Sequence, residues 1–303
     1  MTNLSGATPV TALPGEAIPY VIESGSGRAH VLLGEVGRAL VGAEESGGAM
    51  SVMALDGPRA ERPIPLHYHD REEELFYVLR GAVALWANDE SRVLTPGDFG
   101  YIPPGTLHAY QLRGHYSTFV GPVVPGGWDR FFDLTGEPFA AAAFPPGPKG
   151  PPPFEKFGRA EAEFQMNFRP DAQYAEPTVD APDDTLPPGQ APFFLRSGEG
   201  PRHELGGLLQ TLLVGAEQTN ASTTMTTVEM AKGRGLPDHV HEHTYAAAAH
   251  YTKILTMSAP AGLEQLIATA GAPTQEHIFT PDAAPFDLDA LREAASGLDV
   301  ALS

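Results

Sequence analysis

The chain has 303 residues, no cysteine and a formal net charge of −19 at pH 7. The absence of cysteine excludes disulfides, thiolate metal sites and cysteine nucleophiles, and the strong negative charge disfavours nucleic acid and anionic membrane surfaces as partners. The 33 glycines and 30 prolines favour short strands joined by turns. Because residues 1–15 show no secretory signal and no apolar run has the length of a membrane span, we expect a cytoplasmic protein.

The chain contains an internal repeat. Residues 19–44 resemble residues 192–217 at a constant offset (192 − 19 = 173), which aligns a Ser-Gly pair and a Val-Gly-Ala-Glu run. Such similarity predicts two copies of one unit. Further matches link PLHYH at 65–69 to PDHVH at 237–241, and His115-Tyr116 to His250-Tyr251.

The repeat sets the predicted domain boundaries. An N-terminal domain is expected over residues 1–145 and a C-terminal domain over 191–303, joined by a Pro-rich connector with a short helix over 146–190. Alternating apolar residues predict strands, and amphipathic patterns predict a short helix closing each copy. The expected strands include 30–34, 91–95 and 223–231, and the expected helices lie within 154–168 and 286–300.

The second copy is shorter than the first. His69 and His115 are 46 positions apart, whereas their counterparts His241 and His250 are 9 apart, so about 37 residues are missing (46 − 9 = 37). Losing central strands would leave unpaired edges. Two interpretations stay open: a deletion in the chain itself, or a recorded sequence that lacks a segment and has side chains shortened to alanine at 246–249. The second is favoured because a deletion should not leave the rest of the copy intact.

A cluster of candidate metal ligands lies in the first copy. His67 and His69 are separated by one residue, a spacing that places both imidazoles on one face of a β-strand. Glu74 follows five residues after His69, and His108 follows a Gly-Asp turn and a Pro-Pro-Gly turn. Three imidazole nitrogens and one carboxylate suit a divalent first-row transition metal, so these four residues are the predicted ligands.

The ligands and the turn residues around them fit two motifs of a known superfamily. The chain resembles the cupins, and its two-copy layout is similar to that of a bicupin. This resemblance implies an all-β fold of two tandem jelly-roll β-barrels with short helices, the second lacking part of its barrel. The first motif matches His67, His69, Glu74 and Gly81, and the second matches Gly97, Pro103, Gly105 and His108.

The motif also distinguishes between three consecutive glutamates. Its six-residue step to Gly81 selects Glu74 as the ligand, and Glu72 and Glu73 are expected in a solvated turn. In the second copy His239 and His241 match the motif, but Ala246 stands where a carboxylate is expected and no equivalent of His108 is present. The second copy is therefore expected to hold only a remnant of a metal site.

Among bicupins, the chain is similar to the flavonol-cleaving quercetin 2,3-dioxygenase family. That resemblance implies one divalent transition metal per intact site (Fe, Mn, Co, Ni or Cu), with a flavonol and O2 as substrates and Glu74 as catalytic base if burial raises its pKa. The products would be a depside and carbon monoxide. A second copy of the chain is a further candidate partner. Candidate residues for a flat apolar substrate pocket are Phe76, Tyr101, Tyr110, Trp128, Phe131 and Phe132.

Cupins support many chemistries, so an alternative function stays open. The chain could be a metal-bearing cupin that binds or isomerises a small ligand without oxygenating it. A storage or scaffold bicupin is disfavoured by the complete ligand set of the first copy. The sequence does not select the metal, the flavonol or the oligomeric state.

Overall fold

The computed structural model places the chain in two compact units. One lies within residues 7–183 and 191–197, and the other within 184–190 and 198–303. We call them the N-terminal and C-terminal units. The described residues are 9–302 without 142–143, 148–149, 151, 180–183, 232–234, 237–238, 241–243, 251–252, 263, 281–282, 285 and 299, and for 239–240, 244–250 and 301 only the backbone is described.

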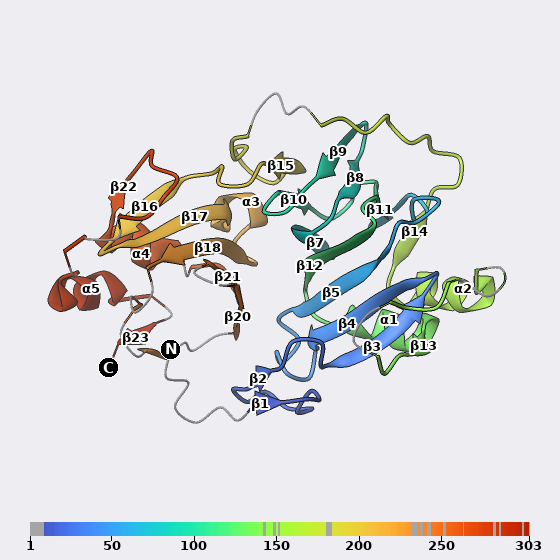
Figure 1. Ribbon diagram of the computed structural model, residues 1–303, viewed down its shortest axis with the longest axis horizontal. Helices are drawn as coiled ribbons and strands as arrows, with labels where there is room; N and C mark the ends of the chain where they lie inside the picture. The colour runs from blue at the N-terminus through green and yellow to red at the C-terminus, as the bar shows by residue number, and fades with distance from the viewer. Residues whose placement is uncertain are drawn as a thin grey trace. The chain divides into compact units, whose positions relative to one another are not determined.

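Two sheets form the barrel of the N-terminal unit (Figure 1). The larger has eight strands in the order β13-β3-β4-β5-β12-β7-β10-β15, and the smaller has five in the order β14-β6-β11-β8-β9. The strands of the larger sheet are β3 (Arg28–Leu32), β4 (Glu35–Val41), β5 (Ser51–Pro58), β7 (Glu73–Arg80), β10 (Phe99–Ile102), β12 (Tyr116–Val124), β13 (Glu137–Pro138) and β15 (Phe193–Leu195). Those of the smaller sheet are β6 (His67–His69), β8 (Val83–Ala87), β9 (Glu90–Leu94), β11 (His108–Leu112) and β14 (Met166–Phe168).

Two helices and a two-stranded sheet complete this unit. The helix α1 (Asp129–Thr135) contacts β3 and β4, and α2 (Phe154–Glu163) contacts α1 and β14. The small parallel sheet joins β1 (Pro9–Val10) to β2 (Val21–Ile22). The prediction of one helix over 154–168 is partly wrong, because Gln165 adopts a left-handed conformation with φ 50° that ends the helical segment and starts β14.

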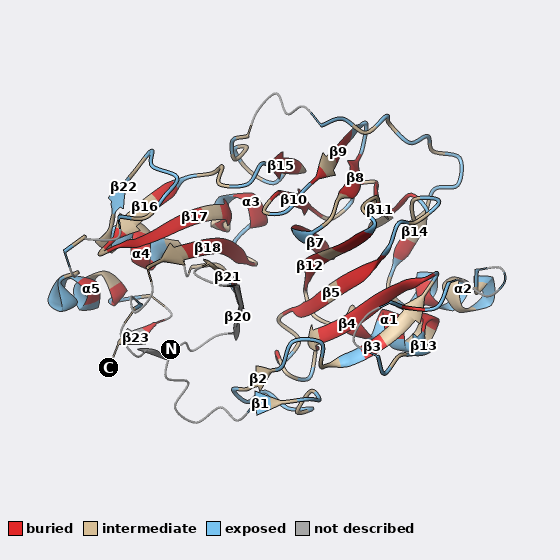
Figure 2. Cartoon of the chain, in the orientation of Figure 1, coloured by how far each residue is buried: buried red, intermediate tan, exposed pale blue. Residues whose placement is uncertain are grey.

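Apolar side chains from both sheets and α1 fill the barrel interior. Figure 2 shows β4, β5 and β12 as mainly buried. Phe132 of α1 packs on the backbone of β4 at Gly37, where an added Cβ would lie 2.4 Å from two atoms of the ring. This close approach brings α1 down onto the sheet, which places the residue before it, Trp128, beside the barrel interior.

The C-terminal unit contains one large sheet with helices beside it. Its six strands follow the order β20-β21-β18-β17-β16-β22, and β19 (His239–Val240) pairs with β23 (Ala301–Leu302). The strands are β16 (Arg202–Leu205), β17 (Leu208–Val214), β18 (Thr224–Met230), β20 (Thr244–His250), β21 (Lys253–Ala259) and β22 (Ala272–Pro273), and the helices are α3 (Ala216–Thr219), α4 (Glu264–Ala270) and α5 (Leu288–Ala295). In the described part of the chain, no helix has the length and apolar character that a membrane crossing requires.

The strand orders of the two units correspond position by position. The series β13-β3-β4-β5-β12-β7 matches β22-β16-β17-β18-β21-β20, as the repeat predicts. The offset is 173 between β4 and β17 but 135 between α1 and α4, so 38 residues are missing between these points (173 − 135 = 38).

The missing residues correspond to the excursion that forms β8 to β11. In the N-terminal unit this excursion connects β7 to β12, which are themselves adjacent antiparallel strands. In the C-terminal unit only residues 251–252 separate β20 from β21, and these two strands pair directly. Because the two flanking strands are sheet neighbours, removing the excursion joins them as a β-hairpin. A deletion at this point therefore does not separate these two strands or leave an unpaired edge between them.

Candidate metal centre

Four side chains converge inside the N-terminal barrel from three strands. His67 and His69 lie on β6, Glu74 lies on β7, and His108 begins β11. The antiparallel pairing of β6 with β11 sets His67 opposite His108. One potential ligand atom from each of the four residues lies within 4.8 Å of those of the others. The strands therefore assemble the ligand set that the spacing predicts.

The four residues are almost completely shielded from solvent. The exposed fractions are 3% for His67, 1% for His69, 9% for Glu74 and 1% for His108. The ring centroids of His67 and His108 are 4.3 Å apart, and those of His67 and His69 are 5.0 Å apart. Burying this many polar groups is costly unless they are bonded to one another or to a cation.

Two of the imidazoles are oriented by the backbone that precedes them. Nδ1 of His67 lies 2.8 Å from the carbonyl oxygen of Pro65, and Nδ1 of His108 lies 2.9 Å from that of Thr106. Because a carbonyl oxygen only accepts, each Nδ1 carries the proton and donates it. Each Nε2 is left with its lone pair toward the cluster, as in metal-ligating histidines.

The arrangement fits a divalent cation better than a hydrogen-bonded cluster. Nε2 of His69 lies 3.0 Å from Oε1 of Glu74, and Nε2 of His108 lies 3.6 Å from Oε2. Among the described residues neither nitrogen has a hydrogen-bond partner with acceptable geometry, although both are buried. Neighbouring ligands on a metal with bonds of about 2.1 Å are separated by about 3.0–3.4 Å. The cluster can thus hold one divalent transition metal.

The protonation states suit ligation. Burial lowers the pKa of the His67 imidazole well below its usual value, and the neighbouring His108 and His69 add to the effect. Burial by itself would raise the pKa of the Glu74 carboxyl, but the adjacent His108 and His69 outweigh it and hold that pKa well below the usual value. The expectation that the barrel raises the pKa of Glu74 is therefore wrong, because polar neighbours surround this carboxylate.

The adjacent glutamate has a different role from the one expected. Glu73 is only 3% exposed, and one of its carboxylate oxygens accepts a 2.5 Å hydrogen bond from the hydroxyl of Tyr101. It is therefore not part of a solvated turn. Tyr101 is paired with Leu75 across the sheet, so it lies on the opposite face from Glu74 and Phe76. This position does not fit the predicted pocket role of Tyr101.

The other predicted pocket residues form two aromatic groups. Phe76 and Tyr110 contact each other and Phe119, and Tyr110 shares a face of β11 with His108. Trp128 contacts the ring of His69 and stacks on Phe131.

Three further aromatic residues lie near the centre: Phe132 belongs to the hydrophobic core, and Phe164 and Phe168 contact residues of the candidate site. Phe132 packs against Gly37 as a core residue. Sequence reasoning missed Phe164, which contacts Trp128, and Phe168, which contacts His67. Both lie within the predicted connector 146–190. The pairing of β14 with β6 places Phe168 beside His67, and Phe164, at the end of α2, reaches Trp128 because α2 contacts α1.

The predicted remnant in the second copy is described only in part. The backbone of His239 belongs to β19, and His241 lies outside the described residues. Among the described residues of the C-terminal unit, no strand corresponds to β8, β9, β10 or β11, and His108 belongs to β11.

Comparison with known proteins agrees with the fold. Residues 58–118, which contain all four ligands, match the family described as cupin domain. The N-terminal unit therefore contains a cupin domain, and the chain has the all-β, two-domain layout of a bicupin. Over nearly its whole length it is similar to a quercetin 2,3-dioxygenase from Bacillus subtilis (strain 168), at 26% identity covering 95% of this chain and 96% of that protein.

Two further similarities are partial. A quercetin 2,3-dioxygenase from Aspergillus japonicus is 32% identical over 130 residues, which cover 41% of this chain and 37% of that protein. Among solved structures, an oxalate decarboxylase from Bacillus subtilis matches with a TM-score of 0.41 and 17% identity, covering 77% of this chain and 66% of that one.

Proposed function

We propose that this protein is a metal-dependent dioxygenase that opens the central ring of a flavonol with O2. The observation that carries the proposal is the buried cluster of three histidines and Glu74, with Glu74 directly beside two imidazole nitrogens. The relatives named quercetin 2,3-dioxygenase support this chemistry for the barrel. The reaction conserves atoms: flavonol and O2 give a depside and carbon monoxide.

The residues of the chain have separable roles in this proposal. His67, His69, Glu74 and His108 would hold the metal, which when bound supplies positive charge that stabilises a deprotonated substrate oxygen. Glu74 is ionised at neutral pH, because its pKa is held low, so it can accept the proton of the flavonol 3-hydroxyl. The shielded barrel excludes water from the resulting anion.

The aromatic residues beside the cluster support a planar substrate. Phe76, Tyr110 and Phe119 form one group of contacting rings, and Trp128 with Phe131 forms another. Aromatic side chains favour offset-stacked and edge-to-face contacts with another ring. We propose Phe76, Tyr110, Trp128 and Phe131 as substrate contacts.

The test is an oxygenation assay on purified protein. Metal-free protein is loaded separately with Fe²⁺, Mn²⁺, Co²⁺, Ni²⁺ or Cu²⁺ and mixed with quercetin in air and under argon. The proposal expects loss of flavonol absorbance, one O2 consumed per flavonol and carbon monoxide released, in air only. The His69→Ala variant serves as the control for turnover that does not depend on the centre.

Two outcomes would overturn the proposal. If no metal supports oxygen uptake above the His69→Ala control, the chain is not a flavonol dioxygenase. If the flavonol binds or rearranges equally under argon, the alternative of a ligand-binding or isomerising cupin is favoured instead.

A further inference from the structure

One of the three imidazoles lacks the backbone support that the other two have. His67 and His108 each donate from Nδ1 to a carbonyl oxygen two residues earlier in the chain. Nδ1 of His69 is buried and has no hydrogen-bond partner among the described residues. A ligand ring without such a partner is free to rotate about its side-chain torsions unless packing holds it.

Besides the other two imidazoles of the cluster, the ring of Trp128 packs against His69. The ring centroids of His69 and Trp128 are 4.7 Å apart, with an interplanar angle of 80°, so the two rings meet edge to face. Trp128 is itself held by Phe131, on which it stacks at 4.7 Å with an interplanar angle of 4°, and by an edge contact with Phe164. The rings of Trp128, Phe131 and Phe164 thus pack together beside one candidate ligand.

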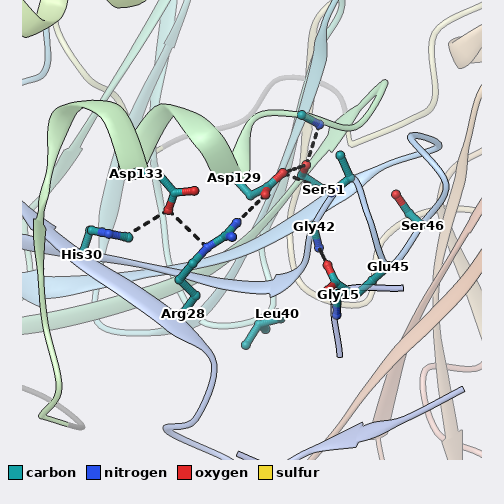
Figure 3. A network of polar contacts seen from close by, with 12 residues as sticks. Gly15, Arg28, His30, Leu40, Gly42, Glu45, Ser46, Ser51, Asp129 and Asp133 are labelled. Atoms are coloured by element: carbon teal, nitrogen blue, oxygen red, sulfur yellow. Dashed lines mark hydrogen bonds and ion pairs between the residues drawn. The ribbon is translucent and has the colours of Figure 1, made fainter. Parts of the chain in front are cut away.

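The backbone around Trp128 is fixed by a polar network. Ser51 accepts a hydrogen bond from the amide of Gly127 and donates one to Asp129, so both neighbours of Trp128 are tied to the same hydroxyl. The buried Asp129 carboxylate also forms an ion pair with Arg28 (Figure 3), and the two atoms are 2.5 Å apart. The amide of Ala43 donates to the same carboxylate at 3.2 Å.

We propose that Trp128 is the positioning residue of the metal ligand His69, taking the place of the missing hydrogen bond at Nδ1. The network at Asp129 and Ser51 fixes the tryptophan backbone, and the tryptophan ring fixes the imidazole. This inference rests on the metal centre and not on flavonol chemistry. Its test uses metal binding, so it can fail while the proposed oxygenation stands.

The first measurement is the affinity for Co²⁺ and the visible absorption of the complex. Trp128→Leu should weaken Co²⁺ binding by about 10–100-fold, the usual effect of removing support behind a ligand, and should shift the Co²⁺ bands. Trp128→Phe retains a ring that can meet His69 and should recover most of the affinity and the wild-type spectrum. The matched control is Trp86→Phe.

Trp86 is a suitable control because it is the other tryptophan of the chain. It is buried, pairs with Ala109 across the sheet and donates to the carbonyl of Ala175. Since Ala109 follows His108 on β11, Trp86 lies on the face opposite the ligands. Trp86→Phe should therefore leave Co²⁺ affinity and the spectrum unchanged.

The Trp86→Phe variant also tests whether Trp128 lies close to the bound metal, without altering Trp128. In Trp86→Phe protein, Trp128 is the sole tryptophan, and Cu²⁺ binding should quench most of its fluorescence. Quenching should be much weaker in Trp128→Phe protein, where only Trp86 emits. Absence of quenching in Trp86→Phe protein would overturn the proposal.

The affinity data decide the positioning role. A folded Trp128→Leu protein with wild-type affinity and spectrum would show that the tryptophan only fills space. If circular dichroism shows that Trp128→Leu is unfolded, Phe131→Leu takes its place, because it keeps Trp128 and removes the ring on which it stacks. Wild-type affinity and spectrum in that variant would equally contradict the proposal.

Discussion

Glu73 and Glu74 are consecutive on β7 and project to opposite faces of the sheet. Glu74 lies 3.0 Å from Nε2 of His69, whereas Glu73 accepts the hydroxyl hydrogen bond of Tyr101. Both residues are at least nine-tenths buried, so burial does not distinguish them. The neighbouring side chains distinguish them: Glu74 faces the histidines of the candidate metal centre, and Glu73 forms a structural hydrogen bond with Tyr101.

This pair provides a matched test of the proposed base. Glu74→Gln keeps the shape of the side chain and an oxygen that can reach the metal, but it removes the proton acceptor. Flavonol turnover should fall by roughly 10²–10⁴-fold, the usual contribution of a positioned base, while metal content stays high. The loss should shrink as pH rises, because more flavonol is then already ionised in solution.

The neighbouring variant Glu73→Gln is the control for that measurement. It weakens a buried hydrogen bond, so it should cost about 1 kcal/mol of unfolding free energy while turnover and metal content change little. If Glu74→Gln turns over flavonol at near wild-type rate at pH 7, Glu74 is a ligand only and the base must be another group.

Removing one imidazole should empty the centre without unfolding the barrel. His69→Ala deletes one of four ligands, and the remaining three cannot compensate for its nitrogen. Metal content measured by elemental analysis should fall from about one per chain to a small fraction of that value. The control is His115→Ala, at an exposed position outside the cluster. Equal metal content in the two variants would refute the ligand assignment.

The buried carboxyl of Glu35 should make stability depend on pH. Burial raises the pKa of Glu35 from 4.5 to about 7, partly offset by the hydrogen bond donated by Tyr110. The folded state binds the proton of the Glu35 carboxyl more tightly than the unfolded state does. The contribution of this proton to the unfolding free energy is therefore complete below pH 4.5 and is lost as pH rises through 7. The loss amounts to about 3 kcal/mol.

Urea unfolding between pH 4.5 and 8 measures this effect. Between pH 4.5 and 8 the unfolding free energy of the wild type should fall by about 3 kcal/mol because Glu35 ionises. The Glu35→Gln variant has no titrating group at this position, so this part of the fall should be absent from its pH profile. Parallel pH profiles for the two proteins would show that Glu35 does not ionise as the burial predicts.

The contact between Gly37 and Phe132 should be sensitive to a single methyl group. In Gly37→Ala the new Cβ would lie 2.4 Å from two ring atoms of Phe132, so the helix or the ring must move. We expect a loss of roughly 1–3 kcal/mol in unfolding free energy. Gly158→Ala is the control, because nothing lies within 4 Å of its Cβ position in α2, and it should stabilise by up to about 1 kcal/mol. Equal effects of the two substitutions would contradict the packing argument.

The second copy shows what the repeat could and could not predict. The offset of 173 predicts the position of β17 from that of β4, because similar sequences adopt the same strand. The sequence also shows that about 37 residues are missing, but not that the flanking strands are sheet neighbours. Adjacency of β20 and β21 is a property of the sheet, and it explains why the remaining strands keep their order.

The sequence by itself predicted the cupin fold and the four residues that the structure brings together as candidate ligands, because ligand spacing and glycine turns are local along the chain. It did not reveal that Tyr101 faces away from Glu74, that the pKa of Glu74 is lowered, or that Trp128 contacts His69. These features depend on which strand and helix lie next to each other. Residues 59 positions apart, such as His69 and Trp128, meet only because Phe132 and Asp129 fix α1 against the sheet.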